Sequence, residues 1–346
     1  MTRFDHALRP GLFGLVLISL AGGPSSAVAE TRAGGVINGD VHWTKAAGPY
    51  VVSEDITIPV GSKLSIGPGV LVKFKPNLAD LKGLRPFDLE IAVHGTLECA
   101  GADGDSIYLT SESLDPSTQD WAGIVVEGKG ALARIDRIVL DSATSGITVT
   151  GGELDISRST IRGCSEQGIL FQRGRGRVYR CTLTMIGNFA GTAKGIHLVQ
   201  SPDVLIDETF IIGAQVGIGM EKGSDAVIRN SLISLCRTYG FTITSSSPEL
   251  LRNNIAQNEY GILLRGRSVP KMKDNNIFDN AAWELQVRDF RGETPGQMPT
   301  LDLSGNWWGK ITPDVAYDRI DDGNDNPSAG GIIKIEPVRA EAWQAD

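Results

Sequence analysis

The stretch GITVTGGELDISRSTIRGCSEQGIL, residues 146–170, holds one complete repeat of the chain and the start of the next. It begins with Gly146-Ile147 and returns to Gly168-Ile169 after 22 residues. Similar pairs open short alternating strands at intervals of 23, 22, 27, 22, 23 and 21 residues. A period of this length is typical of a solenoid. The pairs are Gly123-Ile124, Gly146-Ile147, Gly168-Ile169, Gly195-Ile196, Gly217-Ile218, Gly240-Phe241 and Gly261-Ile262.

A second column of residues, in another part of each repeat, keeps nearly the same phase. Each member is a short polar residue followed by an apolar one. We expect the apolar residues to fill the interior, and the polar side chains to hydrogen-bond from rung to rung at a bend. The polar members are Thr160, Thr182, Thr209, Ser231, Asn254, Asn276 and Asn306. The apolar members are Ile161, Leu183, Phe210, Leu232, Ile255, Ile277 and Trp307.

Together the two columns predict an all-β fold, a single right-handed parallel β-helix of roughly ten rungs over residues 30–346. A repeat of about 22 residues with short strands and no helix cannot bury its apolar face alone, so it must stack on its neighbours. Loops that leave such a coil are where repeat proteins usually place their binding sites. The period is interrupted at residues 78–88, 111–120, 187–194 and 288–298.

The N-terminus has the pattern of a secretory signal peptide, which we expect to be residues 1–29. Arg3 and Arg9 precede an apolar run at residues 11–20, and Ala27-Val28-Ala29 supplies small residues for cleavage. This run is too short to span a membrane, and no later segment is uniformly apolar. The sequence therefore predicts export to the periplasm or the extracellular space, with no transmembrane segment.

The charge balance excludes one class of partner. The chain has 33 basic and 41 acidic residues, and removal of residues 1–29 leaves 31 and 40, a net charge near −9. Such a surface keeps a protein soluble but does not suit a general nucleic-acid partner. The cysteines are too sparse and irregular for a disulfide framework or a zinc site, and we expect buried thiols. They are Cys99, Cys164, Cys181 and Cys236.

Over nearly the whole mature chain, the sequence resembles the bacterial right-handed parallel β-helix repeat proteins of the pectate-lyase-like superfamily. Besides the Gly-Ile pairs, the resemblance rests on motifs near both ends of the coil. These are Gly48-Pro49-Tyr50-Val51-Val52, Ile66-Gly67-Pro68-Gly69-Val70, Gly95-Thr96-Leu97, Ile107–Ser111, Trp121-Ala122-Gly123-Ile124, Asn306-Trp307-Trp308-Gly309, Ile320-Asp321-Asp322 and Pro337. The resemblance implies the coil but not one activity, because that superfamily contains lyases, epimerases and surface proteins. The sequence carries none of the catalytic signatures of its alginate epimerases, polygalacturonases or calcium-dependent pectate lyases.

One exposed pair in the Gly-Ile strands could build a general base. Alternation places the isoleucines inward, so His197 and Glu221 face outward on adjacent rungs. The alternative is an isolated surface histidine, because no third orienting group is evident in the sequence. Glu127 and Glu221 lie four rungs apart, about 19 Å. They are too far apart to act as a glycosidase acid and base.

A column of charged residues precedes the apolar members of the second column. It consists of Arg158, Arg180, Asp207, Arg229, Arg252 and Asp274. One interpretation is an exposed salt-bridge ladder. The other is a strip that binds anions, because guanidinium groups suit carboxylate or sulfate. The resulting candidates for glycan binding are Arg180, Asp207, Arg229, Arg252, His197 and Glu221.

No cofactor and no metal are predicted, with calcium as the one alternative. His42, His94 and His197 lie in unrelated segments without ligand spacing. An oxygen-rich run near the C-terminus lacks the glutamate and spacing of an EF-hand, so we expect a solvated turn there. Its members are Asp321, Asp322, Asn324, Asp325 and Asn326.

The sequence favours an exported, non-catalytic β-helix scaffold that binds acidic glycans at the cell envelope or surface. The alternative is a polysaccharide lyase or epimerase that acts on a uronate polymer. A weaker third hypothesis is a periplasmic maturation or metal-handling factor, which the scarcity of histidine and methionine disfavours.

Overall fold

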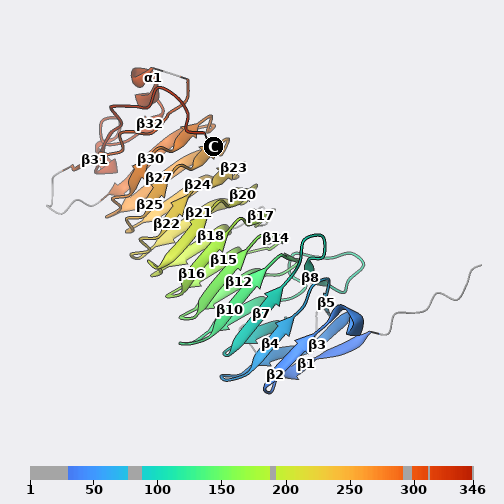
Figure 1. The fold of residues 1–346 in the computed structure, drawn as a ribbon. Helices are drawn as coiled ribbons and strands as arrows, with labels where there is room; N and C mark the ends of the chain where they lie inside the picture. Colours follow the sequence, from blue (N-terminus) through green and yellow to red (C-terminus); the bar gives the residue numbers. More distant parts are fainter. Residues whose placement is uncertain (1–29, 77–87, 188–191, 291–297, 311, 345–346) are drawn as a thin grey trace, which may run out of the picture.

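The structure is a computed structural model that describes residues 30–76, 88–187, 192–290, 298–310 and 312–344. The chain winds into a rod of stacked coils, from β1 (Thr31–Val36) at one end to the segment around α1 (Pro313–Tyr317) at the other (Figure 1). The predicted signal peptide at residues 1–29 lies outside the described residues. So do most of the interruptions that we located at 78–88 and 288–298, and the middle of the one at 187–194.

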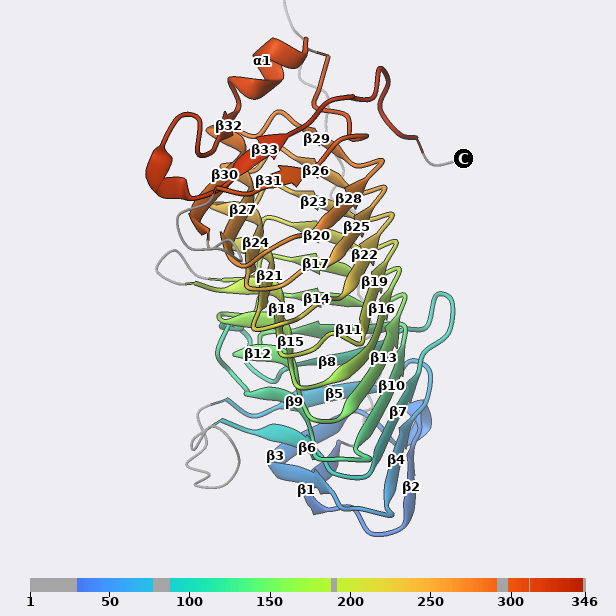
Figure 2. The same cartoon turned by 90° about the vertical axis from the view of Figure 1, so that its left-hand side faces the viewer.

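Each coil contributes strands to three stacks, which Figure 2 shows side by side. Stack A contains the Gly-Ile strands: β6 (Glu90–Val93), β9 (Gly123–Glu127), β12 (Ser145–Thr150), β15 (Gln167–Gln172), β18 (Lys194–Val199), β21 (Val216–Glu221), β24 (Tyr239–Thr244), β27 (Tyr260–Gly266), β30 (Trp283–Phe290) and β32 (Ile320–Asp321). Stack B contains β2 (Asp40–Trp43), β4 (Lys63–Ile66), β7 (Thr96–Ala100), β10 (Leu132–Asp136), β13 (Glu153–Ser157), β16 (Arg175–Tyr179), β19 (Val204–Asp207), β22 (Val227–Arg229), β25 (Glu249–Leu251) and β28 (Lys271–Lys273). Stack C contains β3 (Tyr50–Ile58), β5 (Leu71–Phe74), β8 (Ile107–Ser111), β11 (Ile138–Asp141), β14 (Thr160–Arg162), β17 (Thr182–Thr184), β20 (Phe210–Ile212), β23 (Leu232–Ser234), β26 (Asn254–Ala256) and β29 (Asn276–Phe278).

Stack A is one parallel sheet, as the repeats predict. Ile147 pairs with Ile169, Ile169 with Ile196 and Ile196 with Ile218, in unbroken register through the 27-residue repeat. Stacks A and C are joined at the N-terminal end, because β3 pairs with β5 by its first half and with β6 by its second.

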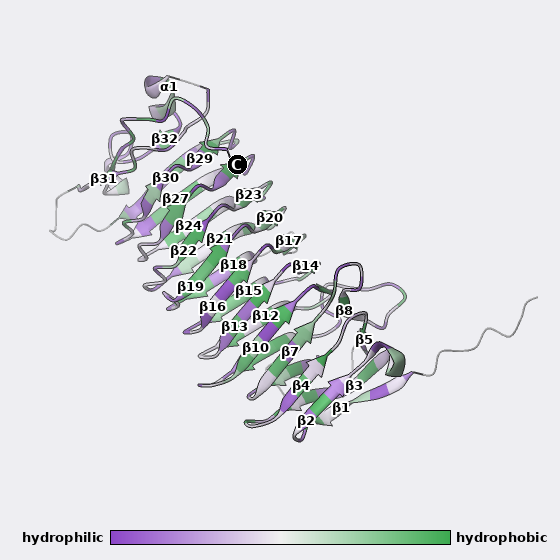
Figure 3. Ribbon diagram, viewed as in Figure 1, coloured by the Kyte–Doolittle hydropathy of each residue, from purple (hydrophilic) through white to green (hydrophobic). Residues whose placement is uncertain are grey.

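The interior follows the alternation of the strands. The inward isoleucines at 147, 169 and 196 are completely buried, and hydrophobic and hydrophilic residues alternate along the strands (Figure 3). The four cysteines are buried and free, as predicted. Burial raises the pKa of Cys99, Cys164 and Cys236 to about 12, so these thiols stay protonated and chemically quiet.

Polar ladders stabilise the corners of the coil from within. At the corner between stacks B and C, one polar residue of each rung donates its backbone N–H to the side-chain oxygen of the equivalent residue on the next rung, with N···O distances of 2.9–3.1 Å. The members of this inner ladder are Thr209, Ser231, Asn253, Asn275 and Asn306. A serine ladder lies between stacks A and B, formed by Ser201, Ser224, Ser246 and Ser268.

The second sequence column is wrong by one residue at several rungs. The outward residues that align across stack C are Thr160, Thr182, Phe210, Leu232, Asn254, Asn276 and Trp307. Thr209, Ser231 and Asn306 belong instead to the inner ladder, together with Asn253 and Asn275. In the rungs of Phe210 and Leu232 two apolar residues follow the polar one, so the pattern alone could not decide which is buried. A slip of one residue moves a side chain to the opposite face, and Phe210 is 48% exposed while Ile211 is fully buried.

Additional elements cover the C-terminal end of the coil. β31 (Thr300–Asp302) pairs with β33 (Ile332–Lys334), and α1 lies beside them with the short 3-10 helix η2 (Pro327–Ala329). A second 3-10 helix, η1 (Lys45–Ala47), follows β2 near the N-terminal end. Within the described residues, no helix has the length and apolar character needed to cross a membrane.

Candidate functional site

The outer face of stack A brings polar side chains from successive rungs into register. His197 on β18 lies beside Gly219 on β21, and Thr242 on β24 beside Leu263 on β27. Two residues further along each strand, Glu221 aligns with Thr244 and then with Arg265. Side chains at one position therefore stand about 4.8 Å apart along the rod.

Near the middle of this face, Lys194, His197 and Glu221 form a cluster of ionisable groups. His197 Nε2 lies 3.2 Å from Glu221 Oε1, and Lys194 Nζ lies 3.8 Å from the same oxygen. The aliphatic part of Lys194 crosses over Gly219: a Cβ added there would lie 2.2 Å from Lys194 Cδ. The sequence paired His197 with Glu221, and the structure adds Lys194 as a third member.

Burial and mutual charge set the protonation of this cluster. Burial lowers the pKa of His197, and the Lys194 ammonium lowers it further, while Glu221 opposes both effects. Burial likewise lowers the pKa of Lys194, with Glu221 acting against it. His197 is therefore neutral at pH 7, the form in which an imidazole accepts a proton.

A pocket of about 340 Å³ opens beside the cluster. Thr242, Leu263 and Tyr239 are among the residues that line it. The Tyr239 ring stacks on Tyr260 with centroids 4.9 Å apart, and its hydroxyl lies 3.4 Å from Gln286 Oε1. Burial, reinforced by Tyr260, raises the pKa of Tyr239, so its hydroxyl is a hydrogen-bond donor at neutral pH.

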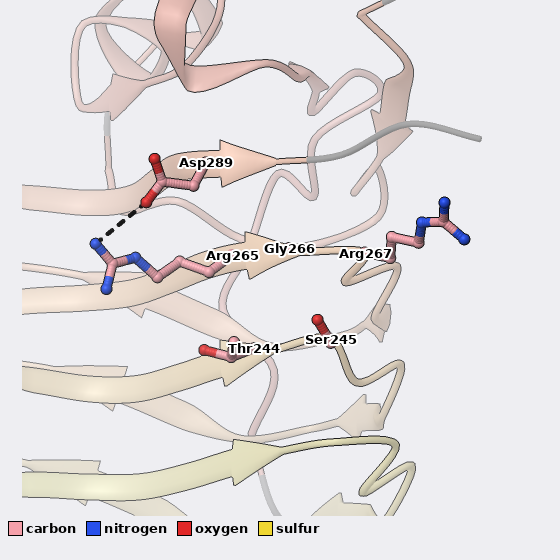
Figure 4. A pocket seen from close by; sticks show the side chains of 6 residues that line it. All are labelled: Thr244, Ser245, Arg265, Gly266, Arg267 and Asp289. Atoms are coloured by element: carbon pink, nitrogen blue, oxygen red, sulfur yellow. Dashed lines mark ion pairs between the residues drawn. The ribbon is translucent and has the colours of Figure 1, made fainter. Parts of the chain in front are cut away.

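A second pocket of about 500 Å³ continues from the first, because both include Thr244 and Arg265. Figure 4 shows Arg265 and Asp289 extending side by side from adjacent rungs, joined by an ion pair of 3.4 Å, while Arg267 points the other way. We call the two pockets together the stack A groove.

The turn that follows stack A carries exposed cations, of which Arg267 lines the second pocket. Arg173 follows β15, Lys222 follows β21 and Arg267 follows β27, at intervals of two rungs. Within the part of the chain that the structure describes, none of the three forms an ion pair. They were not predicted from the sequence, because they lie outside the outward positions of the Gly-Ile strands. The signal was present, since each lies one or two residues beyond the last outward residue of its strand.

The arginine column does not form one straight ladder. Tyr179, Asp207 and Arg229 align at the ends of stack B strands. Arg158, Arg180 and Arg252 lie one residue later, in a left-handed turn with φ between 47° and 56°. The predicted arginine column mixed these two positions because its members were chosen three residues before the apolar members of the second column. That column is displaced by one residue at Phe210 and Leu232.

Most charges of that column already have partners. Arg180 Nε lies 2.6 Å from Glu208, and Arg229 Nη2 lies 2.9 Å from Asp207. Although burial raises the pKa of Asp207, hydrogen bonds from Arg229 and Asn230 outweigh it and hold this pKa below its ordinary value. The guanidinium carbon of Arg252 lies over the Trp343 ring, 6.0 Å from its centroid. Of the six predicted glycan contacts, only Glu221 lines the stack A groove, and His197 lies next to it through its contact with Glu221.

The oxygen-rich run at the C-terminal end is engaged by protein donors. Asp321 forms an ion pair with Arg288 and accepts a hydrogen bond from Gln286 at 3.1 Å. Asp322 accepts from the backbone N–H groups of Asn324 and Ile333. In the described ranges no group of three or more histidine, cysteine or acidic residues could hold a metal ion.

Comparison with known proteins supports the fold. Residues 145–289 match the family described as the right handed beta helix region, which confirms the resemblance to right-handed parallel β-helix proteins. A crystal structure of the periplasmic alginate epimerase AlgG aligns over 87% of this chain and 81% of that chain, with 13% identity and a TM-score of 0.41. A likeness this distant carries no argument about function. No curated protein matches the sequence.

Proposed function

We propose that the stack A groove binds an acidic polysaccharide, and that the protein is an exported scaffold for this polymer in the periplasm or outside the cell. The observation that carries the proposal is the row of exposed cations Arg173, Lys222 and Arg267, which form no ion pair with any residue that the structure describes. Arg267 lines one of the two joined pockets. An open groove along stacked rungs suits a polymer, because equivalent contacts recur along its length.

The groove offers the contacts that an acidic sugar chain requires. Thr242 and Thr244 present hydroxyl groups, and the stacked rings of Tyr239 and Tyr260 present aromatic surface. From Arg173 to Arg267 the row of cations spans four rungs, about 19 Å. Several carboxylates of one polymer can therefore meet cations at the same time. Each contact is weak and screened by salt, so affinity arises from their number.

Binding to a uronate polymer at low and high salt tests this proposal. The groove variant replaces Arg173, Lys222 and Arg267 by alanine. The matched control removes the same number of cations from the arginine column, as an Arg180, Arg229 and Arg252 triple alanine variant. We expect isothermal titration to show salt-sensitive binding by wild type and by the control, and loss of binding by the groove variant. Equal binding by the groove variant and wild type would refute the groove. Loss in the control variant alone would assign the polymer to the arginine column.

The cluster of ionisable groups favours a second candidate function, a lyase or epimerase that acts on the same polymer. Neutral His197 lies 3.2 Å from Glu221, which lines the groove, and could accept the proton on the carbon next to a uronate carboxylate. In a lyase, the electron pair left on that carbon would form a double bond as the glycosidic oxygen departs. The test is ultraviolet absorbance from unsaturated uronates, with His197→Ala as control. Absence of new absorbance and of any change in sugar configuration, with binding intact, would leave the scaffold function.

A further inference from the structure

The outer face of stack C carries an apolar patch on three adjacent rungs. We call it the stack C patch; its members are Met185, Phe210, Ile212, Leu232 and Leu235. Phe210 is 48% exposed, Met185 57% and Leu235 54%. Phe210 and Leu232 align directly, with Thr182 on one side of them and Asn254 on the other. The same column therefore changes from polar to apolar and back within a few rungs.

Two members of the patch hold an unfavourable backbone conformation. Met185 has φ of 53° and Leu235 has φ of 54°, a region that residues with a Cβ rarely adopt. The rung between them has Gly213 at this position. Large apolar side chains are thus kept at exposed left-handed turns where glycine or asparagine would be more stable.

The same face already holds an extended segment of this chain. The Asn276 side chain donates to Trp343 O at 2.9 Å and accepts from Trp343 N at 2.8 Å. One amide thus satisfies both backbone groups of one residue, as a neighbouring strand would. Asn276 also donates to Asn254 Oδ1 at 2.6 Å, so this seat connects directly with the next rung toward the patch.

We propose that the stack C patch, together with Asn254, binds an extended apolar segment of a partner protein, in continuation of the seat that holds Trp343. The backbone of the segment would follow the outward column, and its alternate side chains would cover Leu232 and Phe210. From Asn276 to Phe210 the column spans three rungs, about 14 Å, which corresponds to about four extended residues. This mode resembles strand addition, with side-chain amides in place of a sheet edge.

A short synthetic peptide tests the proposal on the full chain. The probe is an end-capped octapeptide of alternating valine and serine, and the control peptide replaces valine by lysine. The protein variant combines Phe210→Thr and Leu232→Thr, the residue that stands at the equivalent position in β14 and β17, with Leu235→Asn. We expect wild type to bind the valine peptide, and this variant to bind it about tenfold more weakly.

Stability separates docking from a structural role. Because asparagine tolerates a left-handed turn better than leucine, the single variant Leu235→Asn should melt at the same temperature as wild type or higher, while it binds the valine peptide more weakly. A lower melting temperature with unchanged binding would mean that the patch serves the fold. Absence of valine-peptide binding to wild type, or equal binding of both peptides, would overturn the proposal. Light scattering that shows a wild-type dimer, lost in the triple variant, would assign the patch to a second copy of the chain instead.

Discussion

The inner amide ladder should contribute more to stability than the outer asparagine column, and two adjacent residues allow a direct comparison. Asn275 and Asn276 are neighbours on β29 and its preceding turn, and they point to opposite faces of the coil wall. We compare Asn275→Leu with Asn276→Leu, because leucine has the same branched arrangement of side-chain heavy atoms as asparagine and lacks its hydrogen-bonding groups.

The magnitude follows from the groups that each change leaves without a partner. Asn275 accepts from Asn253 N at 2.9 Å and donates to Leu250 O at 2.8 Å, all in the dry interior. A buried polar group without a partner costs about 1–3 kcal/mol, so loss of these two contacts predicts about 3 kcal/mol after relaxation. Asn276 is also buried, but its partners Asn254 and Trp343 are only half-buried. Water can replace those contacts, so we expect about 1 kcal/mol.

The assay is equilibrium unfolding in urea, followed by circular dichroism, with the slope against denaturant checked for both variants. A larger loss in free energy of unfolding for Asn275→Leu supports the inner ladder. A larger loss in free energy of unfolding for Asn276→Leu would refute this reasoning. It would show that the outer asparagine column, which the sequence alone favours, contributes more to stability.

Three further outcomes follow from the charges and thiols. Replacing Glu221 by glutamine removes the one group that raises the pKa of His197, so an NMR titration should give a still lower pKa for His197; an unchanged pKa would mean that the pair does not interact. Asp207 has a lowered pKa in the folded state, so its contribution to stability is present above the unfolded pKa and is lost as pH falls through the folded pKa. Urea unfolding should therefore show that Asp207→Asn is less stable than wild type at pH 7 and loses less stability on acidification. Parallel curves of stability against pH for the two proteins would contradict this. Native protein at pH 8 should not react with a thiol reagent, because burial raises the pKa of Cys99, Cys164 and Cys236 to about 12; rapid modification before unfolding would show that these thiols are accessible.

The sequence predicted the coil and its stack A register because the Gly-Ile pairs leave little freedom. At the start of each strand the backbone of the next rung comes so close that only glycine fits: a Cβ on Gly146 would lie 2.5 Å from Gly168 O. Short polar residues at corners carry less information. Thr209 and Ser231 precede two apolar residues, Phe210-Ile211 and Leu232-Ile233, and burial selects the second of each. Only packing between rungs decides that choice.

The candidate site was harder to predict, because its members come from positions with no common pattern. His197 and Glu221 were visible as outward residues on adjacent rungs. Lys194 precedes its glycine and reaches the cluster only because Gly219 leaves room for its side chain. Tyr239 extends over Tyr260 toward Gln286, across two rungs. Such diagonal contacts depend on side-chain length and rotamer, which a column of aligned letters does not show.

The most direct test of the account is a crystal structure of the protein with a uronate hexasaccharide. We predict that the sugar chain lies along the stack A groove, with carboxylates toward Arg173, Lys222 or Arg267 and at least one ring against Tyr239. Sugar density along Arg180, Arg229 and Arg252 instead, with the stack A groove empty, would contradict the assignment.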